Sequence, residues 1–147
     1  MNATADPHKL QRFIDAQEPV ISSVLAELKH GRKRGHWIWF IFPQLKGLGR
    51  SSTAEFYGIT SLGEAVAYLK HPVLGQHLTQ CTELVNAVEG SDAEGIFGEI
   101  DAMKFRSCMT LFARADPGNH VFADALKKYF AGDPDPLTTS YLDGSRK

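Results

Sequence analysis

Apolar residues recur along most of this chain at spacings of three and four. Only one segment has the residue types of a strand, and no other stretch could pair with it. The clearest pattern lies between Pro72 and Gly90, where apolar positions step by four, three, four and three residues. Residues at these spacings share one face of a helix, so the pattern predicts an amphipathic helix that Gly90 ends. Its apolar positions are Leu74, Leu78, Cys81, Val85 and Val88.

Residues that typically start and stop helices divide the first two thirds of the chain. Asp6-Pro7 and Pro19 are expected to open the first two helices, and Gly31 is expected to end the second. Further helix starts are predicted where a Ser and a Glu three residues later can satisfy each other's backbone N–H groups. These capping boxes are Ser52–Glu55, Ser61–Glu64 and Ser91–Glu94.

The last third of the chain continues the helical pattern. Asp101–Ala113 carries apolar residues on nearly every side, which predicts a buried helix. Asn119 is expected to cap another helix that Gly132 ends, and Asp135-Pro136 to open the last one. The whole pattern predicts an all-α protein, a single compact domain of about eight short helices over residues 1–147. Its ends, at 1–6 and 143–147, are expected to fray.

The segment His36–Phe42 is ambiguous. Its residue types favour a strand, but it is apolar on both faces and has no partner strand. We therefore expect a buried short helix or an irregular segment that ends at Pro43. The basic run Arg32–Arg34 precedes this aromatic block, and the glycine loop Gly47–Arg50 follows it.

Composition adds limits rather than a function. The net charge of −1, with 22% charged residues, argues against a broad nucleic-acid or membrane footprint. The chain has neither a signal-peptide pattern nor an apolar run near the roughly 18–20 residues of a membrane span, so a cytoplasmic protein is expected. Cys81 and Cys108 lie in apolar helical patterns and are expected to be buried free thiols, with a disulfide left open.

Four polar residues are candidates for chemistry. His36 is the best acid/base candidate because the pKa of histidine lies near 7. Asp101, Lys104 and Arg106 are charges on an apolar helix, so each must be paired or functional. An Asp101–Lys104 ion pair, or Asp101 as a helix cap, is the structural alternative. For an enzyme, the catalytic candidates are His36, Asp101 and Lys104.

Several nearby residues would suit a ligand that carries a phosphate and a flat ring. Arginine grips phosphate, a glycine loop before a helix can aim N–H groups at it, and aromatic rings stack on bases. A solvated helix end, a glycine turn and an aromatic core are the plainer explanations. No histidine spacing indicates a metal site, and no cofactor is indicated. The ligand-binding candidates are Arg34, Trp37, Trp39, Gln44, Gly49, Arg50, Tyr57 and Arg106.

The run GRKRGHWIWFIFPQLKGLGRS, followed by YGI, EAVAYLKHPVLG and the segment from IFG to MTLF, resembles the DUF1810 family. The resemblance extends from about Leu10 to Leu142. It implies a small bacterial all-α protein and no activity, because that family is named for having no known function. In one departure, this chain has Cys108 after Arg106-Ser107, where family members often have a second serine.

The order of elements is more loosely similar to the NADAR group, small helical proteins linked to cleavage of N-glycosidic bonds in ribose-phosphate or ADP-ribose compounds. No shared motif accompanies this similarity, so no catalytic residue is carried over.

Two functions are therefore expected as alternatives. The first is binding of a phosphate-bearing, nucleoside-type small molecule. If this protein hydrolyses an N-glycosidic bond, Asp101 would stabilise positive charge on the sugar and His36 would act as acid/base. This reading requires the aromatic block, the glycine loop and the Asp101 helix to meet. The second is a non-catalytic protein-interaction module that uses the basic run and the aromatic block.

Overall fold

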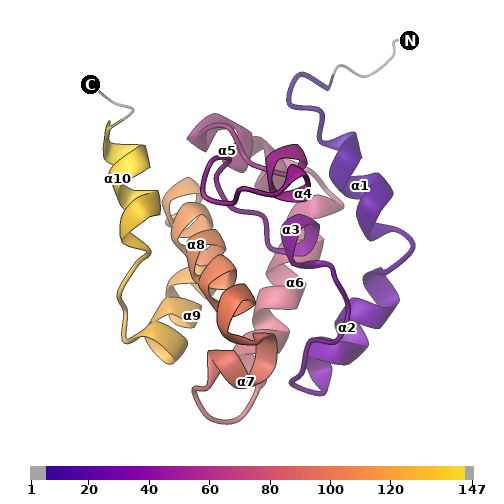
Figure 1. The fold of residues 1–147 in the computed structure, drawn as a ribbon, viewed down its shortest axis with the longest axis vertical. Helices are drawn as coiled ribbons and strands as arrows, with labels where there is room; N and C mark the ends of the chain where they lie inside the picture. The colour runs from indigo at the N-terminus through magenta and orange to yellow at the C-terminus, as the bar shows by residue number, and fades with distance from the viewer. Residues whose placement is uncertain (1–5, 145–147) are drawn as a thin grey trace.

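The computed structural model describes residues 6–144, and over that range the chain forms helices joined by loops and turns, with no strand (Figure 1). The all-α prediction is confirmed, with ten helices in the described range where about eight were expected. The helices are α1 (Gln11–Gln17), α2 (Ile21–Lys29), α3 (Ile38–Ile41), α4 (Ser52–Phe56), α5 (Leu62–Lys70), α6 (Leu74–Ala87), α7 (Ala93–Phe97), α8 (Glu99–Ala115), α9 (Val121–Phe130) and α10 (Pro136–Gly144).

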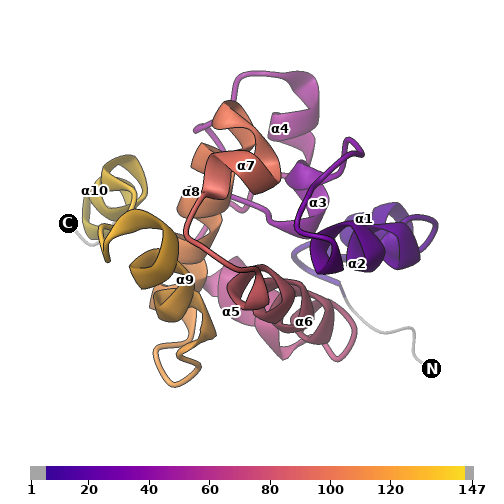
Figure 2. The same ribbon diagram turned by 90° about the horizontal axis from the view of Figure 1, so that it is seen from below.

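Helix α8 is the centre of the arrangement. It packs against α5, α7, α9 and α10, and Figures 1 and 2 show it between the α9–α10 pair and the N-terminal helices. From Phe105 to Phe112 it is buried on nearly every side, as its apolar pattern predicts. Its first turns differ from that prediction, because Ile100 and Met103 are 67% and 66% exposed. No neighbouring helix covers this end of α8 on the side that carries these two residues.

The aromatic block forms the short helix α3, which confirms the prediction of a buried short helix. Phe42 follows this helix and meets Phe97 and Phe105 edge to face, at centroid distances of 5.8 and 5.0 Å. Edge-to-face contacts of this kind add stability beyond the buried area alone. The block thus anchors α3 against α7 and α8, and most of it is core. Its buried members are Trp37, Ile38, Ile41 and Phe42.

In two of the three predicted capping boxes, the residue that caps the helix lies one position away from the expected serine. Ser51, rather than Ser52, accepts the Ala54 N–H at 3.0 Å, and Asp92, rather than Ser91, accepts the Gly95 N–H at 3.0 Å. A capping residue keeps a non-helical backbone, and Ser51 is extended whereas Ser52 is already helical. Ser61 caps α5 as predicted.

The first helices begin later than Asp6-Pro7 and Pro19 suggested, at Gln11 and Ile21. The Asp6 carboxylate still accepts the N–H groups of Leu10 and Gln11, at 2.8 and 3.0 Å, so it caps α1 across an intervening turn. Of the ends expected to fray, 1–6 and 143–147, residues 1–5 and 145–147 lie outside the described residues. Asp143 and Gly144, which were also expected to fray, are the last residues of α10.

Both cysteines are buried and free, as expected. Burial raises the pKa of the Cys81 thiol to about 12, and it raises the pKa of Cys108 well above its ordinary value. A protonated, buried thiol is a poor nucleophile, so neither cysteine offers reactive chemistry. Within the described range, no helix is long and apolar enough to cross a membrane.

Candidate functional site

A groove of about 200 Å³ lies between the loop after the aromatic block, the first half of α8 and the start of α10. We call it the Lys104 groove. A narrow gap of about 10 Å³, which shares Gln44 and Lys104 with this groove, is also lined by Trp39 and Tyr57. The aromatic block, the glycine loop and the Asp101 helix therefore meet, as the small-molecule hypothesis requires. The groove is lined chiefly by Gln44, Leu48, Gly49, Met103, Lys104 and Leu137.

Backbone pairing holds the loop against the segment between α4 and α5. Lys46 donates its N–H to the Ile59 carbonyl at 2.8 Å, and Ile59 donates to the Gln44 carbonyl at 2.9 Å. Gly58 lies so close to this pair that a Cβ atom there would be 2.5 Å from the Lys46 Cβ. Only glycine permits that approach without a shift of the backbone.

Gly49 brings the end of the loop onto the groove wall. A Cβ atom at this position would lie 2.5 Å from the Ala54 Cβ and 3.2 Å from the Gln44 Nε2. The loop therefore closes over α4 only because this residue has no side chain. The closure places the Gln44 amide beside Lys104 in the groove wall.

Lys104 is half-buried and makes no hydrogen bond or ion pair with any residue in the described part of the chain. The Gln44 amide and the Tyr57 hydroxyl likewise have no hydrogen-bond partner in the described range. An ammonium group without a protein partner can form a charge-assisted hydrogen bond with an anionic ligand. Gln44 and Lys104 thus line the groove, and Tyr57 lines the narrow gap beside it.

The predicted Asp101–Lys104 ion pair is wrong. The Asp101 carboxylate instead pairs with Lys33 at 2.8 Å, in a contact between the basic run and α8. The alternative role of Asp101 as a helix cap is also wrong, because Gly98 occupies that position. Local spacing could not show a partner so distant in sequence.

Lys33 points inward, unlike its two arginine neighbours. Its side chain is 8% exposed, and its ammonium lies 5.2 Å from the centroid of the Trp37 ring. Arg32 and Arg34 are exposed around a separate surface hollow beside α2. Trp37 is buried and donates its indole N–H to Glu27 at 3.0 Å.

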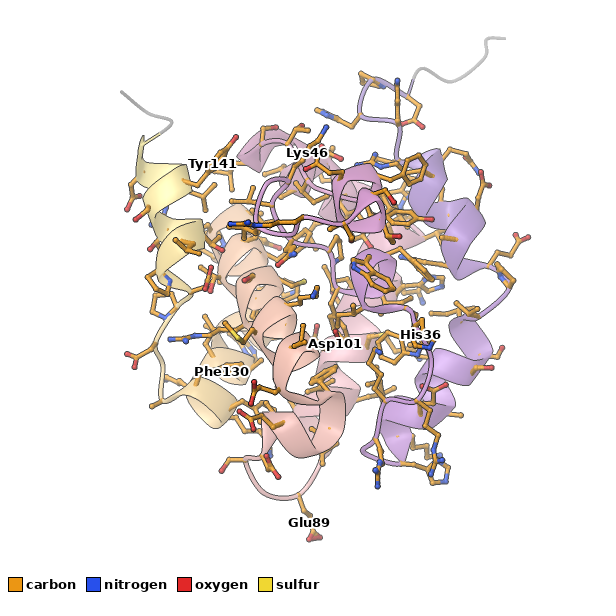
Figure 3. The ribbon with its side chains drawn as sticks, viewed as in Figure 1. His36, Lys46, Glu89, Asp101, Phe130 and Tyr141 are labelled. Atoms are coloured by element: carbon orange, nitrogen blue, oxygen red, sulfur yellow. The ribbon has the colours of Figure 1, made fainter. Side chains whose placement is uncertain are left out.

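His36 is exposed on the loop before α3, and Figure 3 shows it apart from Asp101. Arg50 is also exposed and does not line the groove. Arg106 lies on another side of α8, where it donates to the carbonyls of Asp133 and Pro134 at 3.1 and 3.3 Å. It holds the α9–α10 connection, which is a structural role.

The structure thus brings five of the predicted site residues to the Lys104 groove and the narrow gap beside it and leaves six elsewhere. Those at the groove are Trp39, Gln44, Gly49, Tyr57 and Lys104. Those elsewhere are Arg34, His36, Trp37, Arg50, Asp101 and Arg106.

Sequence reasoning missed the apolar rim of the groove. Ile100, Met103 and Leu137 are 66–67% exposed and stand beside Lys104. Exposed apolar clusters with polar neighbours mark binding surfaces. The apolar spacing predicted that Ile100 and Met103 are core residues, but in the folded chain no helix covers them. The one sign of the groove in the sequence was a lysine, Lys104, between apolar residues of α8.

Three comparisons with known proteins bear on identity. The DUF1810 family model, described as a protein of unknown function, matches residues 7–142. The fold is similar to that of the conserved hypothetical protein Rv1873 from Mycobacterium tuberculosis. The TM-score is 0.93, with 54% identity over 94% of this chain and 99% of that one. No curated protein matches, and nothing supports the looser similarity to the NADAR group. This chain therefore belongs to the DUF1810 family.

Proposed function

We propose that this protein binds a small organic anion in the Lys104 groove. The observation that carries the proposal is the half-buried residue Lys104, whose ammonium has no partner among the described residues. An anion at this point would form a charge-assisted hydrogen bond with it. Gln44 would add a donor and an acceptor, and the Tyr57 hydroxyl a further donor.

The rim defines the rest of the ligand. Met103, Leu137 and Leu48 offer apolar contact beside the cation, so the ligand combines a negative group with an apolar or flat part. A groove of about 200 Å³ is below the roughly 300–1,000 Å³ of typical ligand pockets, so it would take one fragment of a larger molecule. A nucleoside monophosphate or a ribose phosphate fits this description.

The geometry supports binding better than hydrolysis of an N-glycosidic bond. Asp101 lies one turn before Lys104 on α8, but its carboxylate is held by Lys33 at 2.8 Å. To stabilise a charged sugar, it would have to leave that ion pair. His36, the proposed acid/base, is exposed and does not line the groove.

A second candidate function is a protein-docking surface, and the exposed rim favours it. Three large apolar side chains at 66–67% exposure are unusual at one place on a small domain. The basic run and the aromatic block, which were the expected docking surface, are less suitable because Lys33 and most of the block face inward.

A thermal-shift screen with AMP, ribose 5-phosphate, ADP-ribose and NAD tests the proposal. At one hundred times Kd, a ligand that binds only the folded state stabilises it by about 2.7 kcal/mol. We expect AMP or ribose 5-phosphate to raise the melting temperature of the native protein and of the exposed control Lys127→Met. Lys104→Met should abolish the shift and leave the unliganded melting temperature nearly unchanged.

The absence of a shift with all four compounds would contradict small-anion binding and leave the docking surface as the better candidate. A shift that persists in Lys104→Met would place the ligand elsewhere on the molecule.

A further inference from the structure

A second hollow of about 400 Å³ lies where the turn before α1, helix α4 and the start of α5 meet. It has no residue in common with the lining of the 200 Å³ Lys104 groove. Lys46 stands on its rim, and Figure 3 shows this side chain near the top of the molecule.

Arg12 fixes the three segments that surround this hollow. Its guanidinium has five N–H donors, and each finds an acceptor at 2.7–3.1 Å. Because every donor is already bonded to the protein, Arg12 has a structural role and is not a ligand-binding group. The acceptors are the carbonyls of His8, Lys9, Phe56 and Gly58 and the carboxylate of Glu64.

The buried carboxylate of Glu64 also lines the hollow, and Arg12 balances its charge. It is 2% exposed and pairs with Arg12 at 2.9 Å. It also accepts the N–H and hydroxyl of Thr60, at 2.9 and 2.8 Å. An ion pair buried in this way contributes no net charge to the hollow, so the rim decides which ligands are attracted.

The rim carries unpaired cations. The ammonium groups of Lys9 and Lys46 make no hydrogen bond or ion pair with the described residues, and the His8 imidazole likewise has no partner in that range. Glu55 is the one unpaired carboxylate that lines the hollow. Two lysines from segments far apart in the chain therefore converge on a preformed hollow with excess positive charge.

Lys9 also has a strained backbone conformation. Its φ of 54° lies in the left-handed region, which residues other than glycine seldom adopt. Arg12 holds the strained turn through the Lys9 carbonyl at 2.9 Å. Strained residues that are held by their surroundings concentrate at ligand sites, and here the strain is in a residue of the rim.

We propose that this hollow is a second binding site, for a compact dianion such as a phosphate monoester or a dicarboxylate. Lys9 and Lys46 hold the two negative charges, and His8 adds a third donor. Phe56, which is 59% exposed at the same hollow, provides apolar contact for the remainder of the ligand.

Isothermal titration calorimetry at low salt with glycerol 3-phosphate and succinate tests this site. We expect one of the two to bind the native protein. Lys9→Gln and Lys46→Gln should each weaken it by about tenfold, the loss of one charge-assisted hydrogen bond. The exposed control Lys127→Gln and the groove variant Lys104→Met should bind as the native protein does. Neither rim ammonium bonds the protein, so both rim variants should keep the native melting temperature.

Tighter binding of glycerol 3-phosphate identifies a phosphate site, and tighter binding of succinate a dicarboxylate site. No heat of binding with either compound, or native affinity in both rim variants, would overturn the proposal.

Discussion

Glu27 shows how single residues hold the basic run in place. One carboxylate oxygen accepts the Arg34 and Gly35 N–H groups at 2.6 and 3.0 Å and the Trp37 indole N–H at 3.0 Å. Partial burial acts to raise the pKa of Glu27, but these donors and the nearby Lys33 outweigh it and the pKa is lowered. A run that looks like an anion-binding edge in the sequence is therefore organised by a carboxylate from α2.

We predict that Glu27→Gln lowers the free energy of unfolding at neutral pH by about 1 kcal/mol, a modest figure because Glu27 is partly exposed. A neutral amide is a weaker acceptor for three N–H groups than a carboxylate. Because the folded-state pKa is lowered, this contribution is present above the ordinary value of 4.5 and is lost as the pH falls through the lowered value. Urea unfolding at pH 7 and near pH 3 measures both differences, and an equal difference at the two pH values would contradict this account.

At the scale of elements, the junction of α5 and α6 is the tightest helix contact that depends on a glycine. A Cβ atom at Gly75 would lie 2.0 Å from the Leu69 carbonyl oxygen. His71 accepts the N–H groups of Val73 and Leu74 at 3.1 and 3.3 Å, which closes the turn. The first turn of α6 therefore rests directly on the end of α5.

We predict that Gly75→Ala destabilises the protein by about 2–3 kcal/mol, because the added methyl group must displace backbone atoms. Gly63→Ala is the matched control: it lies in α5, where the nearest atom to an added Cβ is 3.6 Å away. Alanine has a higher helix propensity than glycine, so this control, in the first turn of α5, should at least keep the native stability. Thermal unfolding followed by circular dichroism measures both variants. A melting temperature of Gly75→Ala at or above that of the native protein would contradict the prediction.

Local sequence signals predicted where the helices lie better than they predicted which helix faces are buried. Capping residues and apolar spacing located most of the helices, although two caps moved by one residue because the backbone conformation decides which polar side chain caps. The spacing of Ile100 and Met103 could not show that they face solvent. That depends on which helices cover this end of α8, and long-range packing decides it.

At the scale of the whole molecule, both candidate sites are assembled from segments far apart in the sequence. Gln44, Lys104 and Leu137 meet at the groove between the 44–49 loop, α8 and α10. Local pattern could identify Lys104 as an unusual charge on an apolar helix. Local pattern could not show that Asp101 pairs with Lys33 and not with Lys104, because that pair forms only in the folded chain.

The central claim is that the Lys104 groove binds a small organic anion. A map of backbone amide chemical shifts during titration with AMP tests it most directly. We predict the largest changes at Leu48, Gly49 and Met103–Lys104, with little change at Arg32–Arg34, and loss of these changes in Lys104→Met. Largest changes at Arg32–Arg34, or an unaltered map in Lys104→Met, would contradict the claim.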